Sequence, residues 1–364
     1  MTGPMGIWQH ALGSDPDPTY GCCADDVSRA LLVDLAHADQ IGWEAVEASA
    51  WRSLRFLGEA FDPAQQLFRN YRGVDGGWAR SEPSQDCQGR VFGALGVALG
   101  VRMDPHFAIR ARGIFAASLH GARALTALRA ISNSVLGCAA ALESQALDHG
   151  LRRETEHMLA ILAARLGDAF AAIPGPDADE WPWPEPVLTY ENGLIPRALI
   201  VAGTRLGDRA MVRLGLDTLD WLIVSQTTGD GRFSPIGSDG WWPWTGERSR
   251  FDQQPIEATT QILACEAAIA VSGEPRYRVA AERAYGWFLG DNEVGVRVAI
   301  PAFGSCHDGL GPRGVNRNQG AESTLMWLTA VERMRTLRGP RRRATAPRPE
   351  TAPARALAVP AGRG

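Results

Sequence analysis

This chain of 364 residues lacks the features that assign a protein to a class at first sight. It has six cysteines, but none forms a CxxC pair and no histidine stands at metal-ligand spacing from one, which argues against structural zinc. Residues 1–15 show no basic segment followed by an apolar one, so we predict no signal peptide. No run of about 18 apolar residues predicts a membrane span. We expect a cytoplasmic protein with reduced cysteines, no metal ion and no organic cofactor.

Positive charge is scarce in most of the chain. The formal net charge is −4, and residues 339–364 carry six Arg and one Glu, so residues 1–338 carry −9 (−4 minus +5). An acidic body argues against nucleic acid as a partner, because phosphate binding needs a basic face. Residues 339–364 are Pro, Arg and Ala with few large apolar residues, which predicts a disordered tail after one domain at residues 1–338.

Convincing strand patterns are absent, and helix follows helix. Amphipathic helices are predicted at residues 42–57, 154–172, 208–224 and 274–289. Helices that are apolar on nearly all sides and rich in Ala and Gly are predicted at residues 91–101, 194–202 and 256–271. Since a helix that is apolar all round has protein on most sides, this alternation predicts an outer layer of helices around an inner one.

The apolar helices number six, which is the number that closes an (α/α)6 toroid. Most of their starts lie roughly 60 to 70 residues apart, the length that a helix, a connection and a returning helix require. The interval before the third start is shorter. The predicted starts are Asp25, Asp86, His120, Glu191, Gln254 and Gln319.

Acidic and amide side chains recur at five of these helix starts, in residues 20–26, 84–90, 188–192, 251–257 and 316–322. The same ends of all inner helices meet at one mouth of a toroid, so these carboxylates are expected to face one another. Glycoside hydrolysis needs such a pair, one protonated and one ionised. Asp25, Asp86 and Asn318 can also be read as helix caps. Asp26, Glu257 and Glu322 fall within a first turn among apolar or small residues, where an unpartnered carboxylate would be costly.

Tryptophans gather in the long loops that lead into the inner helices. Long loops in a compact domain usually carry function. Tryptophan suits the flat C–H face of a pyranose ring, although packing alone explains two or three of these five. They are Trp78, Trp183, Trp241, Trp242 and Trp244. Of the seven histidines only His120 and His307 fall near the predicted mouth, which gives little support to a mechanism based on a histidine pair.

Several of these segments resemble elements of bacterial six-hairpin glycosidase-like domains, some of which are fused to glycosyltransferases. Residues 25–31 (DDVSRAL) are similar to the element DDNARAL, residues 89–96 (GRVFGALG) to GRALWALG, and residues 188–199 (LTYENGLIPRAL) to LTYDNARLPQAL. Residues 251–258 and 316–323 match two further elements. The resemblance extends to about residue 338 and implies an (α/α)6 fold in a carbohydrate context. Ala24, Val27 and Glu191 depart from the usual Thr, Asn and Asp.

The sequence therefore predicts an all-α (α/α)6 toroid that acts as a glycoside hydrolase on an oligosaccharide. Asp26 is our candidate acid/base, with Glu191 or Glu257 opposite and Asp86 as a further catalytic candidate. The substrate-binding candidates are Asp25, Arg90, Trp183, Tyr190, Trp241, Trp242, Gln254, His307, Asn318, Gln319 and Glu322. A non-catalytic sugar-binding protein, an epimerase-like enzyme and a terpene cyclase-like toroid are the alternatives. The sugar, the linkage and the oligomeric state are left open.

Overall fold

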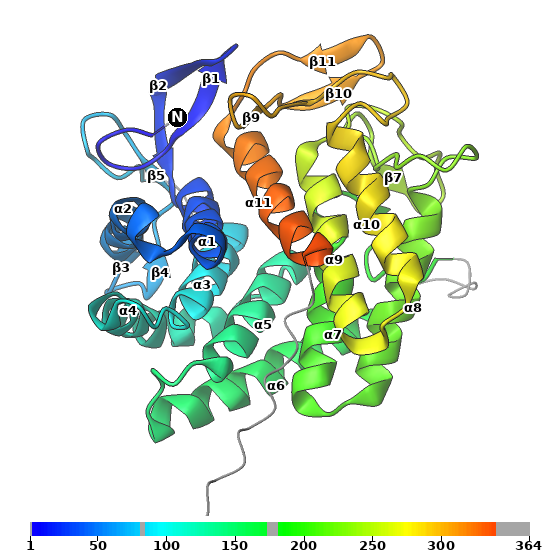
Figure 1. The fold of residues 1–364 in the computed structure, drawn as a ribbon. Coiled ribbons are helices and arrows are strands. Elements are labelled where there is room, and N and C mark those ends of the chain that lie inside the picture. The colour runs from blue at the N-terminus through cyan, green and yellow to red at the C-terminus, as the bar shows by residue number, and fades with distance from the viewer. Residues whose placement is uncertain (1, 81–83, 173–180, 340–364) are drawn as a thin grey trace, which may run out of the picture.

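The computed structural model describes residues 2–80, 84–172 and 181–339 (Figure 1). Eleven α-helices dominate this part of the chain. They are α1 Ala24–Ile41, α2 Glu47–Ala60, α3 Gln85–Ala98, α4 Pro105–Arg123, α5 Leu128–Glu143, α6 His149–Ala171, α7 Leu194–Leu206, α8 Arg209–Ser225, α9 Pro255–Ser272, α10 Pro275–Phe288 and α11 Ala321–Arg338.

The helices form two concentric layers. Helices α1, α3, α5, α7, α9 and α11 make a closed inner ring, because each packs on the next and α11 packs back on α1. Within the described residues, α2, α4, α6, α8 and α10 form the outer layer, each against the inner helix that precedes it (Figure 1). The predicted all-α toroid of the (α/α)6 type is thus confirmed.

Small residues explain how the inner helices approach one another so closely. A Cβ atom on Gly89 of α3 would lie 2.6 Å from the Cα atom of Ala130 in α5, and one on Gly93 would lie 2.9 Å from the carbonyl oxygen of Asn133. Gly96 faces Gly137 across the same contact. The Ala and Gly content that distinguishes the inner helices in the sequence therefore serves close backbone packing.

Local sequence signals define the hairpins. Asp104, Asp148 and Asp208 each accept hydrogen bonds from backbone N–H groups at the starts of α4, α6 and α8, which satisfies donors that the helix cannot. Gly207 and Gly273 end α7 and α9 at φ angles of +71° and +69°, a conformation that costs glycine little. These signals set the short connections from α7 to α8 and from α9 to α10.

One of the six predicted inner-helix starts is wrong. His120 lies in the last turn of α4, is exposed and belongs to the outer layer. The third inner helix, α5, begins at Leu128 instead. The prediction failed because α4 carries as much Ala and Gly as an inner helix. Asp104 and Pro105 mark the true start of this helix.

Short strands, which the sequence pattern did not reveal, border the mouth of the toroid. Strands β1 (Trp8–Leu12) and β2 (Asp15–Cys23) form a hairpin extended by β5 (Tyr71–Arg72), and β2 runs directly into α1. Strands β10 (Gly309–Gly311) and β11 (Gly314–Asn316) form a second hairpin at the same end (Figure 1). The remaining elements are η1 Trp43–Ala45, β3 Phe61–Asp62, β4 Leu67–Phe68, β6 Val187–Leu188, β7 Trp242–Pro243, β8 Ala299–Ile300 and β9 Ser305–Cys306.

The structure also bears on the predictions about membrane spans, cysteines and the tail. No described helix combines the length and apolarity needed to cross a membrane. All six cysteines are buried free thiols. The predicted tail lies outside the described residues, apart from Gly339 at its start.

Candidate active site at the mouth of the toroid

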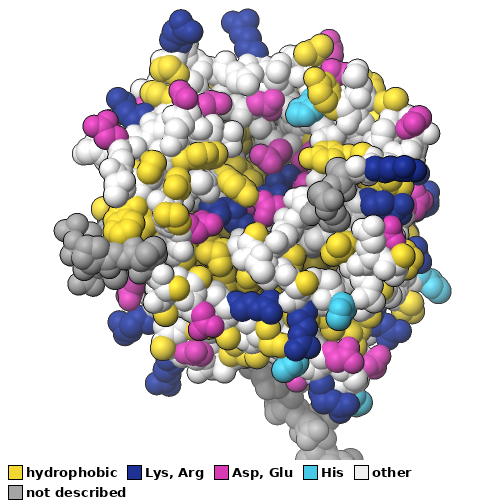
Figure 2. Space-filling view, turned by 180° about the vertical axis from the view of Figure 1, so that it is seen from behind, with side chains coloured by type: hydrophobic (Ala, Val, Ile, Leu, Met, Phe, Trp, Pro, Cys, Tyr) yellow, Lys and Arg dark blue, Asp and Glu magenta, His cyan; other side chains and the backbone are white. Residues whose placement is uncertain are grey.

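The inner helices all begin at one end of the toroid. After each inner helix, an outer helix brings the chain back, so the next inner helix starts at the same end. Their first turns and the loops before them therefore surround one mouth. The face in Figure 2 is hollowed near its middle, and both acidic and basic side chains gather in the hollow. Polar side chains from distant parts of the chain meet at this end of the toroid.

Arg90 of α3 is the centre of this polar network. Its Nη1 atom lies 3.1 Å from Oδ1 of Asp25, and its Nη2 atom lies 2.7 Å from Oε2 of Glu191. Oδ2 of Asp86, one turn earlier in α3, lies 3.8 Å from the same Nη2 atom. Burial opposes the charged form, but Glu191 and Asp25 outweigh it and raise the pKa of Arg90. Three carboxylates from three helix starts thus surround one guanidinium group.

Asp25 and Asp86 each have a second partner. The side-chain amide of Asn70 donates to Oδ2 of Asp25 at 2.7 Å, and its oxygen accepts the backbone N–H of Ala24 at 3.1 Å. The hydroxyl of Tyr190 donates to Oδ2 of Asp86 at 2.6 Å. Burial and this bond to a carboxylate raise the pKa of Tyr190. Both carboxylates are thereby fixed in orientation. No motif around Asn70 marks it as a member of this network.

Glu191 is held by the backbone as well as by Arg90. Its φ angle is +56°, a left-handed conformation that is uncommon outside glycine and is often retained at functional sites. Glu257 accepts the backbone N–H of Glu191, the backbone N–H of Asn192 at 3.3 Å and the side-chain amide of Asn192 at 2.9 Å. Burial raises the pKa of Glu257 to about 7 against the effect of these bonds. Glu257 therefore supports the loop that presents Glu191 and does not itself line the cavity.

Asp26 also lies behind the cavity wall. Its Oδ1 atom is 2.9 Å from Nη1 of Arg29, and its Oδ2 atom accepts a hydrogen bond from Sγ of Cys23 at 3.1 Å. The Nη2 atom of Arg29 lies 2.7 Å from Oε2 of Glu322. Burial raises the pKa of Asp26, while Arg29 opposes the change. Asp26 and Glu322 thus both act on Arg29, which does line the cavity.

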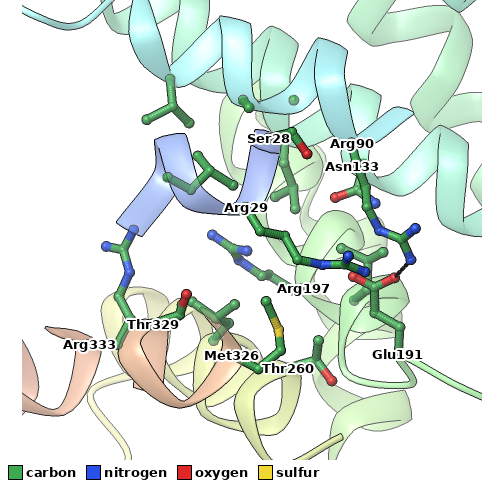
Figure 3. A pocket seen from close by; sticks show the side chains of 17 residues that line it. Ser28, Arg29, Arg90, Asn133, Glu191, Arg197, Thr260, Met326, Thr329 and Arg333 are labelled. Atoms are coloured by element: carbon green, nitrogen blue, oxygen red, sulfur yellow. Dashed lines mark hydrogen bonds and ion pairs between the residues drawn. The ribbon is translucent and has the colours of Figure 1, made fainter. Parts of the chain in front are cut away.

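The mouth continues into a cavity of about 110 Å³ along the axis of the toroid. Every inner helix contributes to its wall, and Figure 3 shows the polar members. They include Arg29, Arg90, Asn133, Arg197, Thr260 and Arg333. Among the described residues that form this wall there is no histidine, and Glu191 is the carboxylate.

The loop tryptophans have two different roles. Trp183 has no exposed surface and stacks on Trp221, with ring centres 6.4 Å apart, so its predicted contact with substrate is wrong. Trp242 also stacks on Trp221, at 5.8 Å, but keeps part of its surface exposed. Trp241 is partly exposed, and its ring centre lies 6.3 Å from that of Tyr190. Trp241 is thus the loop tryptophan that the structure connects to the carboxylate network.

The remaining predicted residues do not line the axial cavity. Gln254 lies 3.4 Å from the hydroxyl of Ser238, and Nδ1 of His307 lies 3.2 Å from the carbonyl of Arg317. Asn318 accepts the backbone N–H of Gly13 at 3.1 Å and so ties the first hairpin to the start of α11. Gln319 lines a separate hollow. These residues shape the loops around the mouth.

Asp252 is a further candidate, which we did not select from the sequence. It precedes α9, which stands opposite α3 in the inner ring, and a Cβ atom on Gly309 would lie 2.7 Å from its Oδ1 atom. Burial, with the charges of Asp239 and Asp308, raises the pKa of Asp252. Asp308 accepts the backbone N–H of Gly320 at 2.6 Å. In the described part of the chain, no three His, Cys, Asp or Glu residues are grouped so as to hold a metal ion.

The sequence matches no protein-family model and no curated protein sequence. The fold, in contrast, is shared with solved structures. A sugar epimerase from a ruminal bacterium is 11% identical, with a TM-score of 0.68 over 92% of this chain and 94% of that chain. Cellobiose 2-epimerase from Spirochaeta thermophila is 13% identical, with a TM-score of 0.65 over 92% of each chain. A GH76 α-mannanase from Bacteroides thetaiotaomicron is 10% identical, with a TM-score of 0.56 over 86% and 87%. At these identities the likeness establishes the fold.

Proposed function

We propose that this toroid is a carbohydrate-active enzyme and that its reaction is the hydrolysis of a glycosidic bond. The observation that carries the proposal is the convergence of Asp25, Asp86 and Glu191 on Arg90 at the mouth of the axial cavity. Three carboxylates around one guanidinium are more than a structural ion pair needs. Carboxylates gathered in a concave site are typical of acid/base catalysis.

Hydrolysis requires one ionised and one protonated carboxyl group on either side of the bond. We assign the role of base or nucleophile to Asp25 or Glu191, because both contact Arg90 at the mouth and Glu191 lines the cavity. One of them would activate water or attack the sugar carbon. We assign the acid role to Asp252, because burial and the charges of the neighbouring Asp239 and Asp308 raise the pKa of its carboxyl group. It would give its proton to the oxygen of the leaving sugar.

This assignment moves the acid role from Asp26, our candidate from the sequence, to Asp252. Asp26 is buried and has one oxygen on Arg29 and the other on Cys23, so neither oxygen is free to meet a substrate. Glu257 becomes a positioning residue for Glu191. Asp86 orients Tyr190, whose ring lies beside Trp241 at the mouth. These two rings offer apolar faces on which a sugar ring can stack.

Epimerisation of a free sugar is the second candidate, because epimerases share this fold as hydrolases do. A sugar epimerase and a cellobiose 2-epimerase are among the solved structures that share the toroid. An epimerase that deprotonates carbon next to a carbonyl needs a base and an acid close to that carbon. Because no histidine is among the described residues that line the cavity, Glu191 would have to serve as the base.

The test is turnover of a panel of oligosaccharides by the wild type and by matched variants. Glu191→Gln and Asp252→Asn should each lower turnover by about a hundredfold or more, the usual effect of a positioned acid or base. Glu154→Gln, an exposed change on the outer helix α6, is the control and should leave turnover unchanged. Sugar affinity, measured by calorimetry, should stay within a few fold in every variant.

Three outcomes would contradict the proposal in different ways. Sugar binding without any turnover by the wild type would favour a non-catalytic sugar-binding protein. Full turnover in Glu191→Gln would remove the Arg90 network from the mechanism. A hundredfold loss in Asp26→Asn with no loss in Asp252→Asn would return the acid role to Asp26.

A further inference from the structure

The axial cavity below the mouth has an unbalanced charge. Its wall carries Arg29, Arg90, Arg197 and Arg333 against the single carboxylate of Glu191. Two of these arginines are compensated by carboxylates in or behind the wall. Arg29 pairs with Asp26 and Glu322, and Arg90 pairs with Asp25 and Glu191. The excess positive charge therefore resides on the other two.

The side chain of Arg197 has no hydrogen bond or ion pair to any residue that the structure describes. Its side chain projects from α7 into the cavity, on the side of Arg333 (Figure 3). Burial first, and then the charge of Arg333, lower the pKa of Arg197 to about 10. Arg333 has one distant partner, because its Nη1 atom lies 3.8 Å from Oε1 of Glu266. Its Nε atom is buried without a hydrogen-bond partner in the described structure.

Two undercompensated guanidinium groups in one cavity oppose folding, since each loses part of its hydration without gaining an anion. An anion between them would remove this cost and complete their hydrogen bonds. Arginine offers parallel N–H donors that match the oxygens of carboxylate, phosphate and sulfate. Asn133, Thr260 and Thr329 add uncharged polar groups to the same wall. A volume of about 110 Å³ has room for such a group.

We infer that the axial cavity is a subsite for an anionic group carried by the sugar substrate, held by Arg197 and Arg333. The inference rests on the proposed function for its claim that the anion belongs to a sugar. It names the substrate class as acidic or esterified sugars: uronic acids, sugar phosphates or sugar sulfates. The neutral part of such a sugar would occupy the mouth, beside Glu191 and Trp241.

Binding of charged and neutral sugars, measured by calorimetry on the full chain, tests this inference. The probes are glucuronate, glucose 6-phosphate, glucose and inorganic phosphate. At least one of the two charged sugars should bind the wild type ten times more tightly than glucose. Arg197→Gln should abolish that preference, and Arg213→Gln, an exposed arginine on the outer helix α8, should change it by less than twofold.

Thermal unfolding distinguishes a variant that has lost the anion site from a variant that does not fold. In buffer without multivalent anions, Arg197→Gln should melt no lower than the wild type, because the substitution removes a charge that has no protein partner. Saturating glucuronate or glucose 6-phosphate should raise the melting temperature of the wild type and of Arg213→Gln only. A lower melting temperature for Arg197→Gln with unchanged ligand preference would make Arg197 structural and overturn the subsite.

The remaining outcomes separate the subsite from the proposed function. Equal affinity for glucose and for both charged sugars would overturn the subsite while leaving a neutral carbohydrate substrate in place. Binding of inorganic phosphate that depends on Arg197, with no binding of any sugar, would support the anion site but overturn its assignment to a sugar. Binding of charged sugars that Arg197→Gln does not weaken would place the anion elsewhere and also overturn the subsite.

Discussion

The carboxyl group of Glu257 should make the stability of this protein depend on pH between about 4.5 and 7. Glu257 is buried behind the cavity wall and accepts hydrogen bonds from Glu191 and Asn192. Burial raises its pKa from the ordinary 4.5 to about 7. The folded state thus binds this proton more tightly than the unfolded state. The resulting stability is fully present below pH 4.5 and is lost as the pH rises through about 7.

The size of the effect follows from the two pKa values. A difference between 4.5 and about 7 corresponds to about 3 kcal/mol, at about 1.4 kcal/mol for each pH unit. Glu257→Gln removes the group that titrates. It also places the side-chain amide nitrogen of Gln beside N–H groups of Glu191 and Asn192 that donate hydrogen bonds to Glu257. We therefore expect Glu257→Gln to lose about 1–3 kcal/mol near pH 5, where the wild type is protonated. The difference in unfolding free energy between the two proteins should shrink as the pH rises, because the wild type loses the stability that protonated Glu257 provides.

Chemical denaturation of both proteins at several pH values between 4.5 and 8.5 measures this directly. Other titrating groups affect both proteins alike, so the difference in unfolding free energy reports Glu257. Parallel stability curves would show that Glu257 has an ordinary pKa. A wild-type advantage that grows with pH would show that the hydrogen bonds from Glu191 and Asn192 outweigh burial, which reverses the reasoning.

Further substitutions test the packing and the roles of the tryptophans. Gly193→Ala should destabilise the protein by several kcal/mol in denaturation, because the new Cβ atom would overlap the carbonyl of Thr260 in α9. Gly113→Ala in α4, where nothing lies within 4 Å of the new Cβ atom, should instead add roughly 0.5–1 kcal/mol. Trp183→Ala should cost about 3–5 kcal/mol of stability as a buried aromatic. Trp241→Ala should lower the melting temperature less than Trp183→Ala does, because Trp241 is only partly buried, and it should weaken sugar binding in calorimetry.

The fold could be predicted from the sequence because its two layers differ in composition. Inner helices need Ala and Gly where backbones meet, as at Gly89 and Gly96, and outer helices need a polar face. The same rule misplaced His120, since composition alone cannot show which layer an Ala-rich helix such as α4 joins. The β1–β2 hairpin escaped prediction because its residues lack a clear alternation of apolar and polar side chains.

The mouth was predicted as a set of clusters, but the individual roles were not. Asp25 and Asp26 are adjacent in the sequence, yet one contacts Arg90 and the other contacts Arg29 behind the wall. Their difference depends on where each points around the start of α1, which spacing alone does not specify. Trp183 lies in a polar, proline-rich loop and is nevertheless fully buried, because Trp221 of α8 packs against it.

Arg197 was missed for a different reason. It falls one turn inside α7, after the cluster that drew attention to Glu191, and nothing in the local sequence marks it as unpaired. Its significance depends on what the other inner helices place nearby, namely Arg333 and an open cavity. The balance of charge in the cavity depends on side chains from all six inner helices, so a local sequence pattern cannot predict it.

The most direct test of the proposed reaction is the fate of an oligosaccharide incubated with the wild-type protein in deuterium oxide. Hydrolysis by the Glu191 and Asp252 pair predicts two shorter sugars in the mass spectrum, neither with deuterium on carbon. An epimerase would return a sugar of the original length that carries one carbon-bound deuterium next to the carbonyl. Cleavage without carbon-bound deuterium, lost in Glu191→Gln, is the result that we predict. Deuterium incorporation without cleavage would contradict the hydrolase.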